Sequence, residues 1–134
     1  MESPNVAAAR RWFEEVWNRK NRAAIFELMP ARCIGHTENG NLAGPEAFAA
    51  VYTQLLSLMP DVRFTLEAVI GQDDLVAVRW LAVGTHSGDG FGQTPTGRRF
   101  EIRGCTWHRY ENGVMVEGWD FYNLGALLQQ IIAT

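Results

Sequence analysis

The sequence of residues 99–122 is RFEIRGCTWHRYENGVMVEGWDFY, and this stretch decides the fold class. Two segments rich in β-branched and aromatic residues, 99–110 and 114–122, flank the dipeptide Asn112-Gly113. Asn-Gly between such segments strongly indicates a β-hairpin, because both residues accept the positive φ of a tight turn. The stretch therefore predicts two long antiparallel strands joined by that turn.

Alternating polarity extends this sheet toward the N-terminus. Residues of one parity are apolar in the segment that follows Pro60, which predicts a half-buried strand carrying Phe64, Leu66, Ala68 and Ile70 on its inner side. Residues 75–86 are apolar on both parities, which predicts a central strand covered on both faces. Residues 61–122 thus predict four antiparallel strands. Residues 87–97 are rich in Gly, Thr and Pro and predict a mobile loop.

Helices are predicted before and after this sheet. Their starts are marked by proline or asparagine at Pro4, Asn21, Pro45 and Asn123. Apolar residues then recur at helical spacing as far as Trp17, Met29, Met59 and Ile131. Helices grouped before an antiparallel sheet are typical of the α+β class. We expect one domain over residues 1–134, in which helices on the concave face of a curved antiparallel sheet enclose a pocket.

Composition narrows the classes of function. The chain has 134 residues, 47% of them hydrophobic, and a net charge of -3, as expected of one globular domain. Basic residues gather only in residues 10–22, which predicts a solvated helix face, so we expect no nucleic-acid partner. No apolar run approaches the roughly 20 residues of a membrane span, and residues 1–9 lack an apolar signal core. These features, with the widely spaced Cys33 and Cys105, predict a cytoplasmic protein without a membrane partner.

Asp120 is the leading candidate functional residue. It shares its parity with Val114, Val116 and Gly118, so it should lie on an apolar sheet face. A carboxyl group that loses water there gains proton affinity, which suits it to proton transfer near neutral pH. The structural alternative is an aspartate held by an arginine or capping a backbone group.

The three histidines are further candidates. His86 ends the strand of residues 75–86 on the parity of Trp80 and could reach the mouth of a pocket, although an exposed strand end is the alternative. His36 lies in a predicted loop, and His108 is interpreted as structural or exposed. His36, His86 and Asp120 would suit a non-haem metal if they converged. They come from three separate elements, so we expect no metal and no cofactor.

Five tryptophans are many for a chain of this length, and most should be core residues. Some aromatic side chains should line the pocket, which favours a flat or ring-shaped apolar ligand. Tyrosine hydroxyls could donate a hydrogen bond to its carbonyl or enolate oxygen. The residues expected to contact this ligand are Trp17, Tyr52, Phe64, Trp80 and Tyr122.

The order of elements and seven short stretches resemble the SnoaL-like polyketide cyclases of the nuclear-transport-factor-2-like superfamily. The stretches are FEEVWN (13–18), GH (35–36), GPEAF (44–48), PDVRF (60–64), GTHSG (84–88), PTGR (95–98) and EGWD (117–120). The resemblance implies a cone-shaped α+β barrel without a metal, often dimeric through its sheet. It also implies an intramolecular aldol ring closure on a polyketide ester, with Asp120 as the acid/base and a pocket role for His36.

The chain departs from the family pattern at several positions. Cyclase members tend to carry a His-Trp-Asp sequence, but Gly118 stands where that histidine would be. Gly104 and Thr106 stand where the preceding strand of those cyclases carries further polar residues. The related limonene epoxide hydrolases use an Asp-Arg-Asp set. Arg79 matches its arginine, but Leu81 replaces the second aspartate, so we do not expect that hydrolysis.

Three functions remain open. In the first, a cofactor-independent cyclase or isomerase uses Asp120 to remove a proton beside a carbonyl, while His86, His36 or Tyr122 stabilises the enolate. In the second, the same pocket serves a non-catalytic ligand-binding protein, which the small number of polar residues around Asp120 favours. In the third, the core is filled and the chain is an interaction module.

The face opposite Asp120 predicts an assembly. It should carry Trp107, Met115, Trp119 and Phe121, which share the other parity. A monomer rarely exposes so large an apolar patch. We therefore expect a homodimer that forms through this face of the sheet.

Overall fold

One curved sheet of six strands organises the computed structural model, which describes residues 2–132. The elements in chain order are α1 (Pro4–Trp12), the π-helical turn η1 (Phe13–Asn18), α2 (Ala23–Leu28), β1 (Ile34–Thr37), β2 (Gly40–Ala43), α3 (Gly44–Leu58), β3 (Arg63–Gln72), β4 (Leu75–Thr85), the 3₁₀ turn η2 (Gly90–Gly92), β5 (Arg99–Glu111), β6 (Val114–Phe121) and α4 (Leu124–Ile132). This arrangement confirms the predicted α+β class.

The strand order is β2-β1-β6-β5-β4-β3. The four long strands β3 to β6 pair antiparallel, as residues 61–122 predict. Asn112 and Gly113 form the β5–β6 turn with φ of 50° and 79°, the positive values that this turn requires. The sequence did not predict β1 and β2, whose four residues each are too few to show an alternating pattern. β1 lies parallel to β6, so the sheet is not wholly antiparallel.

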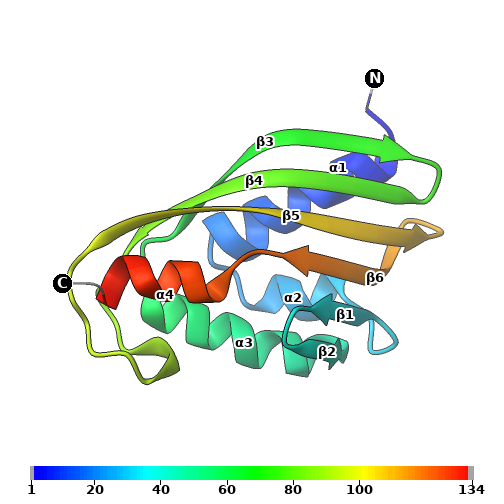
Figure 1. The fold of residues 1–134 in the computed structure, drawn as a ribbon. Helices are drawn as coiled ribbons and strands as arrows, with labels where there is room; N and C mark the ends of the chain where they lie inside the picture. Colours follow the sequence, from blue (N-terminus) through cyan, green and yellow to red (C-terminus); the bar gives the residue numbers. More distant parts are fainter. Residues whose placement is uncertain (1, 133–134) are drawn as a thin grey trace.

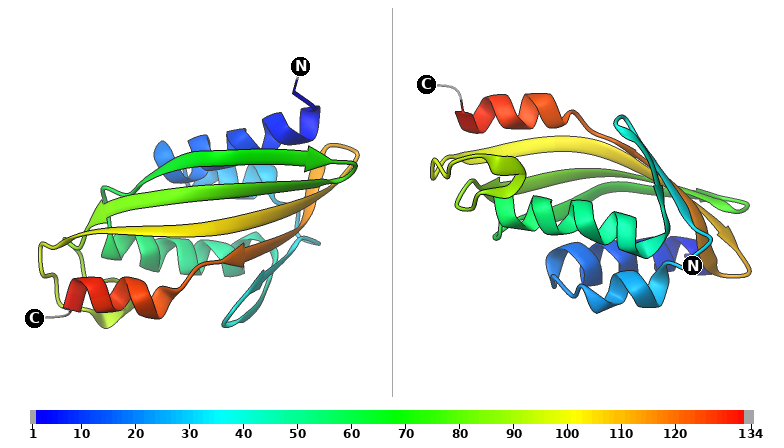
Figure 2. Two further views of the ribbon diagram at one scale, coloured as in Figure 1. Left: turned by 45° about the horizontal axis from the view of Figure 1, so that its top comes forward. Right: turned by 90° about the horizontal axis from the view of Figure 1, so that it is seen from below.

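Helices α1, α2 and α3 lie together against one face of the sheet, as expected (Figure 1). The two views of Figure 2 show the sheet curving over these helices, with α4 following its β6 side. The opposite face carries no helix among residues 2–132, so β4 is well buried on one face only. Val76, Val78 and Trp80 are buried, whereas Ala77 between them is half-buried and Arg79 is exposed. In a single chain, the expectation that this strand is covered on both faces is therefore wrong.

Helix α4 covers the part of β5 that β6 leaves unpaired. β6 ends opposite Cys105, so residues 99–104 have a free edge. The side-chain amide of Gln130 donates to the Glu101 carbonyl (2.9 Å) and accepts from the Glu101 N–H (3.1 Å). One glutamine thus replaces the backbone of a neighbouring strand, and the helix that carries it closes the core with the buried side chain of Leu127.

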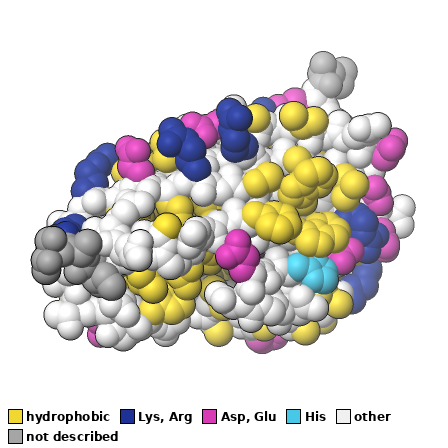
Figure 3. Space-filling view, in the orientation of Figure 1, with side chains coloured by type: hydrophobic (Ala, Val, Ile, Leu, Met, Phe, Trp, Pro, Cys, Tyr) yellow, Lys and Arg dark blue, Asp and Glu magenta, His cyan; other side chains and the backbone are white. Residues whose placement is uncertain are grey.

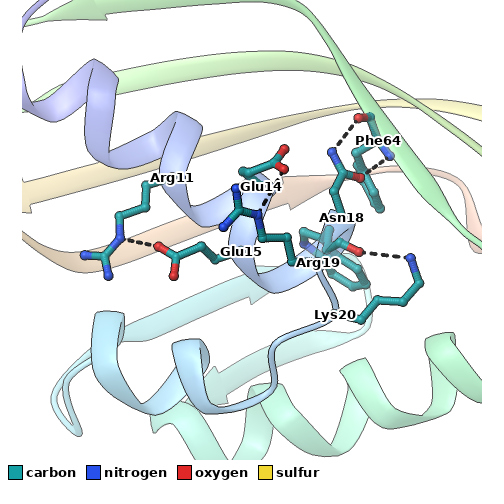
Figure 4. A network of polar contacts seen from close by, with 8 residues as sticks. Arg11, Glu14, Glu15, Asn18, Arg19, Lys20 and Phe64 are labelled. Carbon is teal, nitrogen blue, oxygen red and sulfur yellow. Dashed lines mark hydrogen bonds and ion pairs between the residues drawn. The ribbon is translucent and has the colours of Figure 1, made fainter.

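The first helix widens into a π turn over residues 13–18 instead of continuing as an α-helix to Trp17. Asn18, the last residue of this turn, donates to the Phe64 carbonyl (3.0 Å) and accepts from the Phe64 N–H (2.8 Å), as Figure 4 shows. These bonds attach the turn to β3. Isolated π turns of this kind occur often at functional sites.

Two β-bulges reverse the faces that the alternating pattern predicts. Glu67 is an extra residue in the pairing of β3 with β4, so Ile70 points outward and is 67% exposed. Val116 is an extra residue in the pairing of β6 with β5, so Met115 points inward and is buried. The predictions that Ile70 faces inward, that Met115 faces outward and that Val114 shares the face of Asp120 are therefore wrong. One inserted residue exchanges the two faces of a strand beyond it.

No helix within residues 2–132 is both long and apolar enough to span a lipid bilayer.

Candidate functional site

An apolar pocket lies between the helices and the inner face of the sheet. Its inner chamber has a volume of about 70 Å³, several times the ~10–15 Å³ that one water requires. An outer chamber of about 460 Å³ adjoins it. Both chambers are lined by Thr37, Leu42, Val51, Asp120 and Tyr122. Asp120 therefore lies where the two chambers meet.

The five predicted ligand-contact residues all line the inner chamber. Trp17, Phe64 and Trp80 form a continuous aromatic wall, with ring centroids 4.9 Å apart in each adjacent pair. The Tyr52 hydroxyl donates to the Val16 carbonyl (2.8 Å), so this hydroxyl serves the fold. Whether these side chains contact a ligand stays a prediction.

Tyr122 lies at the junction of the two chambers, because it lines both of them. Burial, assisted by the negative charge of Asp120, raises the pKa of Tyr122 to about 12. Its hydroxyl therefore keeps its proton at neutral pH and can act as a hydrogen-bond donor.

Asp120 projects from the inner face of β6, opposite Thr106 of β5. The Thr106 hydroxyl donates to Asp120 Oδ1 (2.8 Å), and Trp80 Nε1 donates to the same hydroxyl (2.9 Å). The carboxyl group is thus held by a hydroxyl, rather than by an arginine or a backbone group. Burial raises the pKa of Asp120, and the hydrogen bond from Thr106 partly opposes this rise. The result is a carboxyl group with increased proton affinity at an apolar cavity.

Gly104 explains the orientation of the Trp80 indole. Gly104 pairs with Trp80 across β4 and β5, and a Cβ atom on Gly104 would lie 2.3 Å from Trp80 Cζ2. Any side chain there would displace the ring. Gly104 stands where the family resemblance implies a polar residue, and its lack of a side chain lets the indole N–H reach Thr106.

His108 is buried, with 3% of its surface exposed, and lines the inner chamber. Its ring stacks on Phe13, with centroids 6.3 Å apart and planes at 16°, and its Nδ1 lies 3.1 Å from the Tyr110 hydroxyl. Burial lowers the pKa of His108 to about 4, so the imidazole is neutral at pH 7. The sequence did not place His108 in the site, although this residue shares the parity of Thr106.

His36 lies on the outer face of the sheet. β1 directs Gly35 and Thr37 into the pocket, so the residue between them points away from it. The His36 ring stacks on Trp119, with centroids 5.4 Å apart, and its Nε2 lies 2.7 Å from Glu117. His36 is not among the residues that line either chamber, so the structure does not support its predicted pocket role.

His86 is fully buried where the loop of residues 87–97 begins. Its Nδ1 lies 3.0 Å from the Thr96 hydroxyl, and its Nε2 has no hydrogen-bond partner among the described residues. His86 lines neither chamber. The structure therefore does not support its predicted position at the mouth of the pocket with Asp120. Three groups that could together hold a metal ion do not converge anywhere in the described part of the chain.

The outer face of the sheet is apolar over part of its area. Figure 3 shows hydrophobic side chains gathered over the strands, with charged side chains and a histidine at their margin. The large apolar residues exposed on this face include Ile70, Trp107 and Phe121, which are 67%, 40% and 51% exposed.

Comparison with solved structures gives extensive matches. A candidate SnoaL-like polyketide cyclase from Jannaschia sp. CCS1 matches with a TM-score of 0.91 and 25% identity, over 99% of this chain and 94% of that one. IdmH, a candidate polyketide cyclase from Streptomyces antibioticus, matches with a TM-score of 0.81 and 25% identity, over 96% of this chain and 98% of IdmH. AclR, a candidate hydroxylase from Streptomyces galilaeus, shares the fold with a TM-score of 0.84 and 24% identity, over 93% of this chain and 78% of AclR.

No curated protein sequence matches the chain. The family model of the SnoaL-like polyketide cyclases, in contrast, matches residues 7–131, which include every residue that lines the pocket. Because this match spans almost the whole chain and the fold agrees with it, the chain belongs to the SnoaL-like polyketide cyclase family.

Proposed function

We propose that the chain is a cofactor-independent enzyme that enolises a carbonyl compound, as in an aldol ring closure or an isomerisation, with Asp120 as the acid/base. The observation that carries this proposal is the Asp120 carboxyl group, which lies at an apolar cavity with a raised pKa. Such a group accepts a proton from the carbon beside a carbonyl and returns it to the product. This proton transfer requires neither a metal nor a redox cofactor.

The hydrogen bonds around Asp120 suit this role. Thr106 occupies Oδ1, and Trp80 fixes the Thr106 hydroxyl. Oδ2 of Asp120 is then the oxygen available to exchange a proton with a ligand. A base held in one orientation requires little rearrangement during the reaction.

The lining of the pocket favours a ring-shaped substrate with polar substituents. The inner chamber is bounded by aromatic rings, which suits a flat apolar ring. The outer chamber adds polar side chains at Glu38, Asn39, Asn41 and Asn123. A polyketide-like molecule meets both requirements, with its reacting carbon beside Asp120.

A non-catalytic ligand-binding protein is the second candidate function. One observation favours it: the carboxyl group of Asp120 has a single hydrogen-bond partner, Thr106, among the described residues. In this alternative, Asp120 would bind a polar group of the ligand without exchanging a proton with carbon.

We also propose that two copies of the chain associate through the outer face of the sheet. The exposed Trp107 and Phe121 support this proposal, because a monomer rarely exposes a large apolar patch. The free cysteines Cys33 and Cys105 suit a reducing compartment such as the cytoplasm.

Deuterium exchange into 2-tetralone, a two-ring ketone, tests the proposed function without knowledge of the natural substrate. We expect the protein to accelerate the exchange of the protons beside the carbonyl, as measured by NMR. Asp120→Asn keeps the size of the side chain and removes its proton chemistry. It should lower the exchange rate by a factor on the order of 100 to 10,000.

Glu117→Gln is the matched control, because Glu117 lies on the same strand with its side chain paired to His36 on the outer face. This variant should exchange at the wild-type rate. Equal rates for Asp120→Asn and the wild type would contradict the proposal. A wild-type protein that binds 2-tetralone without accelerating exchange would favour the ligand-binding alternative.

A further inference from the structure

The pocket contains a further polar group that the chemistry above does not use, the imidazole of His108. We propose that His108 donates a hydrogen bond from Nε2 to the oxygen of a carbonyl or enolate ligand, and that Tyr110 fixes the tautomer that makes this possible. The catalytic part of this inference rests on the proposed function. The binding part does not.

The Tyr110 hydroxyl determines which nitrogen of His108 carries the proton. Tyr110 is buried, and His108 Nδ1, at 3.1 Å, is the hydrogen-bond partner of its hydroxyl among the described residues. Burial raises the pKa of Tyr110, so the hydroxyl keeps its proton. A buried phenol with one partner donates to it, which makes Nδ1 the acceptor. In a neutral imidazole the proton then lies on Nε2.

Nε2 of His108 is available to a ligand. It forms no hydrogen bond with any described residue. Among the described residues, the one side-chain nitrogen or oxygen that is both fully buried and without a hydrogen bond is Nε2 of His86. Nε2 of His108 is therefore accessible, and the space beside it is the inner chamber that His108 lines. An N–H group fixed in an apolar cavity stabilises negative charge that develops on a carbonyl oxygen.

Gly118 lies next to this imidazole, on the neighbouring strand. His108 and Gly118 are paired residues of β5 and β6, and a Cβ atom on Gly118 would lie 3.6 Å from His108 Cδ2, the carbon bonded to Nε2. Gly118 occupies the position where the family resemblance implies a histidine. Here an imidazole reaches the same part of the cavity from the neighbouring strand.

Asp120 and His108 would then contact two different atoms of one ligand. Asp120 is two residues from Gly118 and on the same face of β6, so it lies diagonally across from His108 on the paired strands. Diagonal neighbours on one sheet face are close enough to contact the same small molecule. The carbonyl oxygen would lie at Nε2 of His108, and the carbon that loses its proton would lie at Asp120.

Two ligands that differ by a single oxygen test the binding part. 2-Naphthol presents a phenolic oxygen on a flat double ring, and naphthalene presents the same ring without it. His108→Phe keeps an aromatic ring against Phe13 and removes the donor. We expect it to weaken 2-naphthol binding by roughly 2- to 10-fold, as for the loss of one neutral hydrogen bond. Naphthalene binding should change less than about twofold.

The variants have two controls. His108→Phe leaves the Tyr110 hydroxyl without its hydrogen-bond partner. The double variant His108→Phe/Tyr110→Phe removes both polar groups. It should show the same ligand selectivity as His108→Phe and be more stable than that single variant. His36→Phe removes a histidine from the outer face and should alter neither affinity. Long-range ¹⁵N–¹H NMR of the unmodified protein should show the His108 proton on Nε2.

Three results would overturn the inference: a proton on Nδ1, an equal loss of affinity for both ligands, or no binding of 2-naphthol by the wild type. Exchange into 2-tetralone separates it from the proposed function. If Asp120→Asn abolishes exchange and His108→Phe leaves it unchanged, His108 has no catalytic role and the function of Asp120 stands. If the wild type catalyses no exchange and the naphthol selectivity holds, the proposed function fails and His108 remains a ligand donor.

Discussion

Burial shifts the pKa values of Asp120 and His108, which both line the pocket, in opposite directions. It raises the pKa of Asp120 and lowers that of His108, because an apolar environment disfavours both the carboxylate and the imidazolium. Each group keeps one protein hydrogen bond, to Thr106 and to Tyr110. The pocket therefore contains a carboxyl group that holds its proton more tightly than usual and an imidazole that is neutral.

The pKa of His108 makes the stability of the protein depend on pH. Because the pKa is about 4 in the folded chain and 6.5 ordinarily, the unfolded chain binds more protons between these values. The free energy of unfolding should therefore fall as the pH decreases from about 6.5 to 4, by on the order of 3 kcal/mol. Urea unfolding at a series of pH values measures this slope, and His108→Phe/Tyr110→Phe should lack it.

Asp120 acts with the opposite sign, because its raised pKa makes the folded chain bind more protons than the unfolded chain. The pH slopes with and without His108 are therefore best compared in two proteins that both carry Asp120→Asn, because the contribution of Asp120 is then absent from both. An unchanged slope in the variant that lacks His108 would show that this histidine is not buried in solution.

At this scale the sequence predicted Asp120 better than the histidines. The parity of one strand and the family resemblance were enough to place Asp120 at the pocket. His108 has the parity of Thr106, but its neighbours Trp107 and Arg109 near the hairpin end suggested a structural or exposed residue. His36 was misplaced because its strand of four residues was not predicted, and in that strand it points outward.

At the scale of elements, the contact between β4 and β5 at Gly104 lies beside the hydrogen bonds from Trp80 to Thr106 and from Thr106 to Asp120. Gly104→Ala should lower the free energy of unfolding by about 1–3 kcal/mol, because the new Cβ atom would overlap the Trp80 ring. It should also disturb the bond from Trp80 to Thr106. Urea unfolding measures the first effect, and the indole N–H resonance of Trp80 reports the second.

Gly118→Ala is the control for this prediction. A Cβ atom on Gly118 would find its nearest neighbours at 3.6 and 3.7 Å, which are ordinary contact distances. This variant should be about as stable as the wild type. If Gly104→Ala were equally stable, the indole could not lie across Gly104 as described.

Long elements were predictable from the sequence, and local irregularities were not. The helices and the four long strands extend over enough residues for their periodicity to be clear. A bulge inserts one residue without a distinctive residue type, so Glu67 and Val116 gave no warning that Ile70 and Met115 would change faces. The π turn of residues 13–18 likewise has the apolar spacing of an ordinary helix.

At the scale of the whole molecule, association through the outer face can be tested with two matched substitutions. Trp107 on the sheet and Phe26 on α2 are 40% and 41% exposed. Trp107→Lys should convert a dimer, at twice the chain's 15.0 kDa, into a monomer in sedimentation experiments at micromolar concentration. Phe26→Lys adds the same charge away from the sheet and should leave the dimer intact. A wild-type protein that sediments only at 15.0 kDa would contradict the proposed association.

The extra residue Glu67 also bears on how the chain behaves at high concentration. β3 forms one end of the sheet, and the outer edge of such a strand can recruit strands from other copies. The bulge interrupts the regular spacing of backbone groups midway along the ten residues of β3, and the side chains of Arg63 and Glu67 add charge. An incoming strand therefore finds no long, even ladder to extend. We therefore expect the irregularity that moves Ile70 to the surface to hinder growth of the protein into cross-β filaments.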